Sequence, residues 1–235
     1  MTTKARVVAE LKQRADAEKA AFYPSFFKTG KGEYGEGDVF LGVTVPHQRR
    51  VARAFRDLPQ REIAKLLSDR RHECRLTGLL ILVEQYERGD EQARAKAAQF
   101  YLDKLDRVNN WDLVDLTAHK ILGPHLEDTD RSLLDELAAS DHLWRQRVAI
   151  IATFHYIRQD DFRDTKRIAR ALINHPHDLI HKAVGWMLRE MGKRDRAELE
   201  RFLKPRYKKM PRTMLRYAIE RLPEGLRKKY LAGKV

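Results

Sequence analysis

The chain has 235 residues, of which 43% are hydrophobic and 34% charged, a composition typical of an ordered globular protein. It contains no apolar run of about 18 residues, and its charged N-terminal segment lacks the apolar core of a signal peptide, so we expect a cytoplasmic protein. Lys and Arg (47) outnumber Asp and Glu (34), which gives a formal net charge of +13 at pH 7. This excess favours a polyanionic partner such as nucleic acid, although an ordinary solvated surface or an anionic membrane surface would also fit.

Residues 1–58 read as helices interrupted by a glycine-rich segment at 28–42, KTGKGEYGEGDVFLG. This segment lacks the spacing of a phosphate-cradling P-loop, because no Ser or Thr follows a Gly-Lys pair in the right frame. We therefore predict a mobile surface loop, from which Lys28 and Lys31 could reach a nucleic-acid backbone. The single Cys74 follows in the apolar segment RHECRLTGLLILV, which predicts a buried thiol in a reducing compartment rather than a nucleophile.

Apolar residues recur at three- and four-residue spacing through most of the chain and strand patterns are almost absent, which predicts an all-α fold. Between residues 59 and 192 the helices form pairs, in which the first helix ends at a leucine and a second, more apolar helix follows a short polar turn. These leucines lie 38, 32 and 35 residues apart, at Leu67, Leu105, Leu137 and Leu172. The interval predicts a single domain over residues 1–235, built as a curved HEAT-like solenoid with a concave binding face. An irregular helical bundle is the alternative.

The repeat also predicts which side chains lie in equivalent places on the second helices. Ten residues after the four leucines stand Thr77, Asp115, Arg147 and Lys182. Trp111 lies four residues before Asp115 and Trp186 four after Lys182, and residues four apart share a helix face. We therefore predict a functional strip that carries both tryptophans with the Asp, Arg and Lys. A packing face is the alternative, because tryptophans are more often core residues.

The C-terminal helices at 193–235 are basic, and five cations fall within the turn KPRYKKMPR at 204–212: Lys204, Arg206, Lys208, Lys209 and Arg212. Such a cluster suits phosphate binding, although a solvated charge run is the simpler interpretation. A zinc site at His177 and His181 is not favoured, because no Glu stands between them as in a zincin helix and no cysteine supports them. We expect neither a metal nor a cofactor.

One carboxylate between two indoles suits the cleavage of a glycosidic bond through a cation-like transition state. Asp115 would stabilise the positive charge that develops on the sugar, or orient the attacking water. The indole faces of Trp111 and Trp186 would attract a cation and pack on deoxyribose, and Arg147 would hold a phosphate.

Four segments together resemble the AlkD-like family of DNA alkylation-repair glycosylases, which are built from HEAT-like repeats: VFLGVTVP at 39–46, NWDLVD at 110–115, DHLWRQRVAI at 141–150 and HKAVGWMLREMGK at 181–193. The resemblance spans roughly residues 20–225 and implies that Trp111, Asp115, Arg147 and Trp186 line a DNA cleft. It also implies metal-free hydrolysis of the N-glycosidic bond of cationic alkylpurines, chiefly N3- and N7-substituted bases, without flipping the lesion into a pocket.

Two features depart from the family pattern. Where the bacterial prototype has two tryptophans before the Asp, this chain has Asn110-Trp111. The prototype also has an N-terminal aromatic residue that contacts DNA, and Phe26, Phe27 or Tyr34 could fill that place. The preferred lesion and the tolerance of bulky adducts are therefore left open.

We predict a monofunctional, monomeric DNA glycosylase that acts on N3-methyladenine and N7-methylguanine types of lesion in duplex DNA. Asp115, Trp111 and Trp186 form the predicted catalytic set. The predicted DNA-binding cations are Arg147, Lys182, Arg189, Lys204, Arg206, Lys208, Lys209 and Arg212. The alternatives are a non-catalytic HEAT-like binder of distorted or branched DNA, and a protein–protein scaffold whose DNA binding would lack a steep salt dependence.

Overall fold

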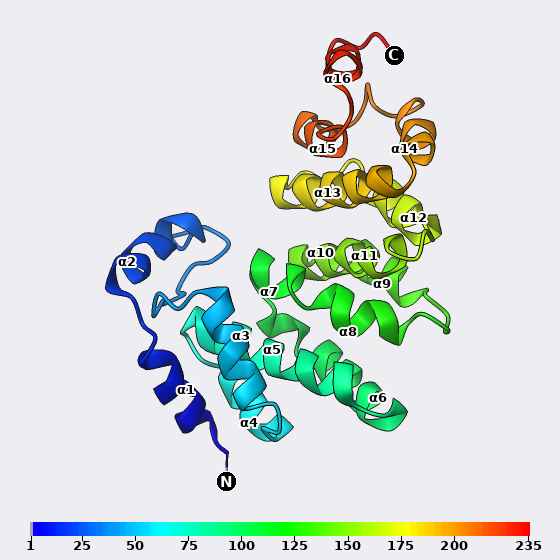
Figure 1. The fold of residues 1–235 in the computed structure, drawn as a ribbon. Helices are drawn as coiled ribbons and strands as arrows, with labels where there is room; N and C mark the ends of the chain where they lie inside the picture. Colours follow the sequence, from blue (N-terminus) through cyan, green and yellow to red (C-terminus); the bar gives the residue numbers. More distant parts are fainter. Residues whose placement is uncertain (1) are drawn as a thin grey trace. The chain divides into compact units, whose positions relative to one another are not determined.

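The computed structural model describes residues 2–235, which form helices joined mostly by short turns, with one long connection between Phe26 and Val45 (Figure 1). Within these residues the one β-type pairing is an isolated parallel bridge between Val39 and Arg71, so the predicted all-α class is confirmed. No helix in this part of the chain is long and apolar enough to cross a membrane. The contacts divide the chain into two compact units, unit 1 ending at Ile121 and unit 2 beginning at Leu122.

Unit 1 is organised around one helix that is buried on every side. Its elements are α1 (Lys4–Lys12), α2 (Ala17–Phe26), α3 (Val45–Ala54), α4 (Gln60–Leu67), α5 (His72–Arg88), α6 (Glu91–Asp103), the 3-10 turn η1 (Leu105–Arg107) and α7 (Trp111–Asp115). Every residue from His72 to Val83 is buried, because α1, α3, α4, α6 and α7 all pack on α5. The run LTGLLILV, apolar around the whole helix, accounts for this central position. The next helix, α8 (Ala118–His125), contains the boundary between the units.

Unit 2 has its own central helix. It contains α9 (Leu133–Ala139), α10 (Leu143–Ala152), α11 (Phe154–Ile157), α12 (Arg163–Ala171), α13 (Asp178–Arg194), α14 (Arg196–Leu203), α15 (Arg212–Ala218) and α16 (Glu224–Leu231). In Figure 1, α13 lies between α10 on one side and α15 on the other, and both helices contact it. Gly185 permits the close approach of α15, because a Cβ there would stand 2.5 Å from the Tyr217 Cβ and 2.6 Å from the Met214 carbonyl oxygen.

The predicted helix pairs are present. The first helices are α4, α6, α9 and α12, and the second helices are α5, α7 with α8, α10 and α13. All four leucines used to align them are buried: Leu67 ends α4, Leu105 and Leu172 lie just beyond α6 and α12, and Leu137 lies in the last turn of α9. The curved solenoid with a concave face stays a prediction, as does the single domain over residues 1–235.

The glycine-rich segment is held more firmly than a mobile surface loop would be. The buried Glu73 carboxylate on α5 accepts hydrogen bonds from the backbone N–H groups of Leu41 (3.0 Å) and Gly42 (2.8 Å). The backbone N–H of Val39 donates to the Arg70 carbonyl oxygen at 3.1 Å. The expectation of a loose loop is therefore corrected for residues 39–43, whose polar backbone is satisfied by the start of α5.

Candidate functional site

The short helix α7 presents Trp111 and Asp115 on one side. Asn110 is fully buried, and its Oδ1 accepts a hydrogen bond from the Trp111 backbone N–H at 2.8 Å, which fixes the start of the helix. The intervening Asp112, Leu113 and Val114 are buried against the unit, whereas Trp111 and Asp115 stay partly exposed. Residues four apart share a helix face, so the predicted indole and carboxylate emerge together.

Trp111 belongs to an aromatic cluster with the end of α2. Its ring stacks on Phe27 with centroids 5.3 Å apart and meets the edge of Phe26 at 5.7 Å. Phe27 is 7% exposed, whereas Phe26 is 49% exposed. Of the three N-terminal aromatic residues predicted as candidates for DNA contact, these two therefore lie beside Trp111, and Phe26 is the one with an accessible ring.

Asp115 is the last residue of α7, and the buried hydroxyl groups of Tyr101 and Thr117 lie near it. The Tyr101 hydroxyl lies 3.1 Å from Thr117 Oγ1, which in turn donates to the Leu113 carbonyl oxygen. Burial raises the pKa of Tyr101, and the nearby negative charge of Asp115 raises it further. The Tyr101 phenol therefore stays neutral. The hydrogen bonds of Tyr101 and Thr117, both between neutral groups, hold the junction between α7 and α8.

A buried ionic network behind Trp111 was missed by the sequence analysis. His72 Nε2 lies 2.8 Å from Asp112 Oδ2, and His72 Nδ1 lies 3.0 Å from Asp38 Oδ2. Arg75 Nη2 also donates to Asp38, at 2.6 Å. Asp112 directly follows Trp111 and is buried, so the available sequence signal was a second acidic residue within α7.

In unit 2, two of the predicted cations meet at the start of α13. Arg147 on α10 is only 4% exposed, and its Nη1 donates to the Leu179 carbonyl oxygen in the first turn of α13. Lys182 pairs with Asp178 at 2.7 Å. Burial lowers the pKa of His177, and the positive charges of Arg147 and Lys182 lower it further. Both predicted cations therefore contact groups in the first turn of α13, and the strip itself stays a prediction.

Trp186 and Arg189 are accompanied by carboxylates that the sequence analysis did not consider. The partly exposed Trp186 donates through Nε1 to Glu190 Oε1 at 3.1 Å. Arg189 pairs with Glu190 at 3.4 Å and with Glu220. Glu190 stands four residues after Trp186, a spacing that could have indicated the contact. These carboxylates offset part of the positive charge that was assigned to DNA binding.

The histidines near α13 serve local structure. His177 Nδ1 accepts a hydrogen bond from the Leu179 backbone N–H at 3.1 Å and so caps the helix. His175 Nε2 lies 2.8 Å from Gln146 Oε1, and His181 Nε2 contacts the His175 carbonyl oxygen. Among residues 2–235, no cluster of potential metal ligands was found.

The basic turn after α14 contains two kinds of cation. Arg206 stacks on Phe202 at 4.8 Å and donates to its carbonyl oxygen at 2.9 Å, and Arg212 donates to the Leu231 carbonyl oxygen at 2.8 Å. The lysines in the turn are exposed and have no ion-pair partner within the described chain: Lys204, Lys208 and Lys209. The lysines are therefore better placed than the arginines to bind a phosphate by charge alone.

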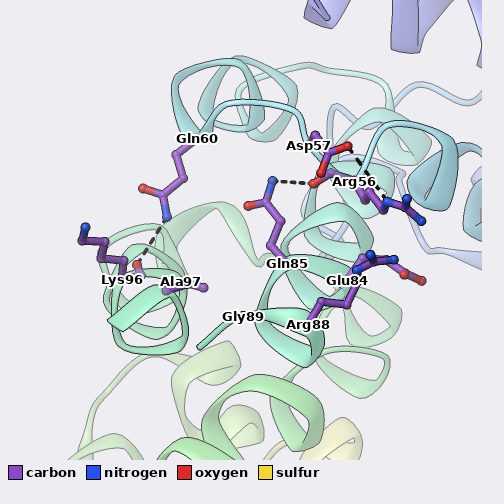
Figure 2. A pocket seen from close by; sticks show the side chains of 10 residues that line it. Arg56, Asp57, Gln60, Glu84, Gln85, Arg88, Gly89, Lys96 and Ala97 are labelled. Atoms are coloured by element: carbon purple, nitrogen blue, oxygen red, sulfur yellow. Dashed lines mark hydrogen bonds and ion pairs between the residues drawn. The ribbon is translucent and has the colours of Figure 1, made fainter. Parts of the chain in front are cut away.

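One pocket of unit 1 includes neither Trp111 nor Asp115 in its lining. It has a volume of 550 Å³ and is lined by residues of α4, α5 and α6, with Gln60, Gln85 and Lys96 among them (Figure 2). Gln85 Nε2 donates to the Arg56 and Leu58 carbonyl oxygens at 2.8 Å, so this side chain closes the turn between α3 and α4. Of the predicted set, Trp111 and Asp115 belong to unit 1 and all the others to unit 2, so a strip that joins them stays a prediction.

A family model described as DNA alkylation repair enzyme matches residues 7–222. A solved structure described as a predicted DNA alkylation repair enzyme from Enterococcus faecalis is 16% identical, with a TM-score of 0.67, and the match covers 90% of this chain and 98% of that one. At this identity the likeness concerns the fold alone. No curated protein sequence matches the chain.

Proposed function

Because the chain belongs to the family of DNA alkylation repair enzymes, as its four sequence segments predict, we propose that it is a DNA glycosylase for cationic alkylated purines in duplex DNA. N3-methyladenine and N7-methylguanine are the type substrates. The observation that carries this proposal is the joint exposure of Trp111 and Asp115 on one face of α7. An indole face and a carboxylate, side by side, match the positive charge that such a reaction places on both base and sugar.

The chemistry requires little beyond that carboxylate. The C1′–N bond breaks with its electron pair moving to the base, which leaves as a neutral purine because it began as a cation. Asp115 would stabilise the oxocarbenium-like sugar and accept a proton from the water that attacks C1′. A positively charged base is already a good leaving group, so no general acid is needed.

Recognition is proposed to occur without flipping the base into a pocket. Trp111 and Trp186 would pack on the sugar–phosphate backbone of the damaged nucleotide, with Phe26 as the accessible N-terminal aromatic residue. The proposed phosphate contacts are Arg147, Lys182, Arg189 and the basic turn at 204–212. The arginines are partly engaged by protein carbonyl or carboxylate groups, so they would chiefly orient the DNA, while the exposed lysines supply charge.

Base release under single-turnover conditions tests the proposal. Wild type should release methylated purines from duplex DNA that carries N7-methylguanine or N3-methyladenine. Asp115→Asn should lower the rate constant by about 100-fold or more, the effect of losing one electrostatic contact to a developing charge. Asp103→Asn, at an exposed site on the last residue of α6, is the matched control and should retain the wild-type rate.

Two outcomes would count against the proposal. Equal rates for wild type and Asp115→Asn would remove the carboxylate from the mechanism. Tight binding of wild type to branched or distorted DNA, with no base released from any alkylated duplex, would favour the non-catalytic binder instead.

A further inference from the structure

The buried ring of His72 connects two segments that lie far apart in the sequence. His72 is the first residue of α5 and is 1% exposed. Its two nitrogens lie 3.0 Å from Asp38 in the glycine-rich segment and 2.8 Å from Asp112 in α7. An ionised carboxylate only accepts hydrogen bonds, so a ring that donates to both must carry a proton on each nitrogen. His72 is therefore an imidazolium in this arrangement.

The groups around His72 favour that charge. Burial opposes it, but the charge of Asp112 and the hydrogen bonds to Asp112 and Asp38 outweigh burial and raise the pKa of His72 to about 9. Arg75 lies against Asp38 and moderates this effect. The charged and titratable groups that face the ring or its partners come from α2, the glycine-rich segment, α5 and α7: Tyr23, Asp38, Glu73, Arg75 and Asp112.

Aromatic rings extend this contact to Trp111. Phe27 lies over the His72 ring with centroids 4.6 Å apart. The Trp111 indole stacks on Phe27, with centroids 5.3 Å apart. Phe40 contacts the imidazole from the glycine-rich segment at 5.3 Å. A cation within about 6 Å of an aromatic face is attracted to it, so the imidazolium also holds Phe27 in place. Trp111 is thus held through its neighbour Asp112 and through its stacked partner.

We infer that His72 is a positioning residue: by bridging Asp38 and Asp112 it fixes the place of α7 on unit 1, and with it the Trp111 indole and the Asp115 carboxylate. The buried ring would not touch DNA. The consequence for catalysis rests on the proposed function, whereas the structural role does not. The two can therefore be tested separately.

The structural role is tested by ¹⁹F NMR of protein labelled with 5-fluorotryptophan, titrated from neutral pH to about pH 10. Three signals are expected, and Trp111→Phe assigns one of them. The Trp111 signal should shift with a midpoint near pH 9, whereas those of Trp144 and Trp186, in unit 2, should not follow that transition. In Asp112→Asn the midpoint should move to lower pH, because the charge that stabilises the imidazolium is gone.

Two further variants make the test specific. His72→Gln should abolish the titration of the Trp111 signal. Asp69→Asn removes another carboxylate of unit 1, whose side chain is 7% exposed and pairs with Lys4 and Arg71 at 2.7 Å, and should leave the titration unchanged. If His72→Gln does not fold, wild type and Asp112→Asn still decide the result. A flat Trp111 signal in folded wild type, or an unchanged midpoint in Asp112→Asn, would overturn the inference.

The catalytic consequence is read from base release. Asp112→Asn should lower the single-turnover rate constant by about 100-fold, the effect of a misplacement near 1 Å, while changing the affinity for DNA by less than about threefold. Asp69→Asn should do neither. If wild type releases no base, the proposed function fails and the fluorine titration still decides whether His72 positions α7. Loss of affinity with an unchanged rate constant would contradict the positioning of Asp115.

Discussion

At the scale of single residues, the His72 imidazolium makes the stability of unit 1 depend on pH. Its pKa is about 9 in the folded chain against an ordinary value of 6.5. The folded state therefore binds the proton more tightly, and this stabilisation is complete below about pH 6.5 and is lost as the pH rises through about 9. Urea unfolding should give a free energy of unfolding that falls between these pH values. In His72→Gln that fall should be smaller, and an identical fall would contradict the linkage.

Cys74 should be inert in the folded protein. The residue is fully buried on α5, and burial raises the pKa of its thiol to about 12. Thiolate is the reactive form, so neither accessibility nor ionisation supports reaction at neutral pH. A disulfide reagent should label less than one thiol per chain without denaturant and one thiol in urea. Rapid labelling of the native protein would show that α5 opens readily.

The sequence was informative about residues whose role follows from local pattern. Cys74 was correctly predicted as buried because it stands in an apolar run. The spacing of Trp111 and Asp115 correctly placed both on one side of α7. The bridge from Asp38 through His72 to Asp112 could not be predicted, since its members lie 34 and 40 residues apart and no spacing rule joins a loop to two helices.

At the scale of elements, periodicity predicted the helix pairs, but one of the second helices is interrupted. The second helix of the second pair is divided into α7 and α8 rather than continuous. Thr117 lies at the division and its hydroxyl donates to the Leu113 carbonyl oxygen, four residues before it. Such bonds compete with the helix and bend it. The glycine-rich segment is a loop as predicted, but the anchoring of Leu41 and Gly42 could not be predicted, because their backbone N–H groups bond to the side chain of Glu73 in α5.

The packing of α13 on α15 leads to a prediction about Gly185. Alanine normally favours a helix over glycine by up to about 1 kcal/mol, but a Cβ here would lie 2.5 Å from the Tyr217 Cβ. Gly185→Ala should therefore lower the free energy of unfolding by about 1–3 kcal/mol, the usual cost of overpacking. Gly225→Ala is the control, because nothing lies within 4 Å of its added Cβ. Chemical denaturation would measure both, and a stabilised Gly185→Ala would show that the two helices can separate without cost.

At the scale of the whole molecule, the net charge of +13 overstates how many cations are available to a partner. Ion pairs engage Lys182, Arg189 and Lys193 with neighbouring carboxylates. The three exposed lysines of the basic turn have no such partner in the described chain. Composition could predict a polyanionic partner and spacing could predict the pairs within α13, but only the folded arrangement shows that Arg189 is balanced by Glu220, 31 residues away.

That distinction predicts how salt will affect DNA binding. The logarithm of the association constant should fall linearly with the logarithm of salt concentration, by about 0.9 for each phosphate contact. Replacing Lys204 and Lys209 by alanine should therefore reduce the slope by up to about 1.8, since each lysine would otherwise displace counterions. Fluorescence anisotropy with an undamaged duplex over a series of salt concentrations gives the slope without any dependence on catalysis.

The matched control removes two lysines whose charge is already balanced. Lys65 pairs with Glu62 at 2.6 Å, and Lys228 pairs with Glu224 at 2.7 Å. Replacing these two lysines by alanine changes the net charge by the same amount as replacing Lys204 and Lys209. If net charge alone governs binding, the salt-dependence slope will decrease by the same amount in the two double variants. If unbalanced lysines at the basic turn contact phosphates, only the Lys204 and Lys209 variant will change it markedly. A slope unchanged in both would remove the turn from the DNA interface and leave the contacts to Arg147, Lys182 and Arg189.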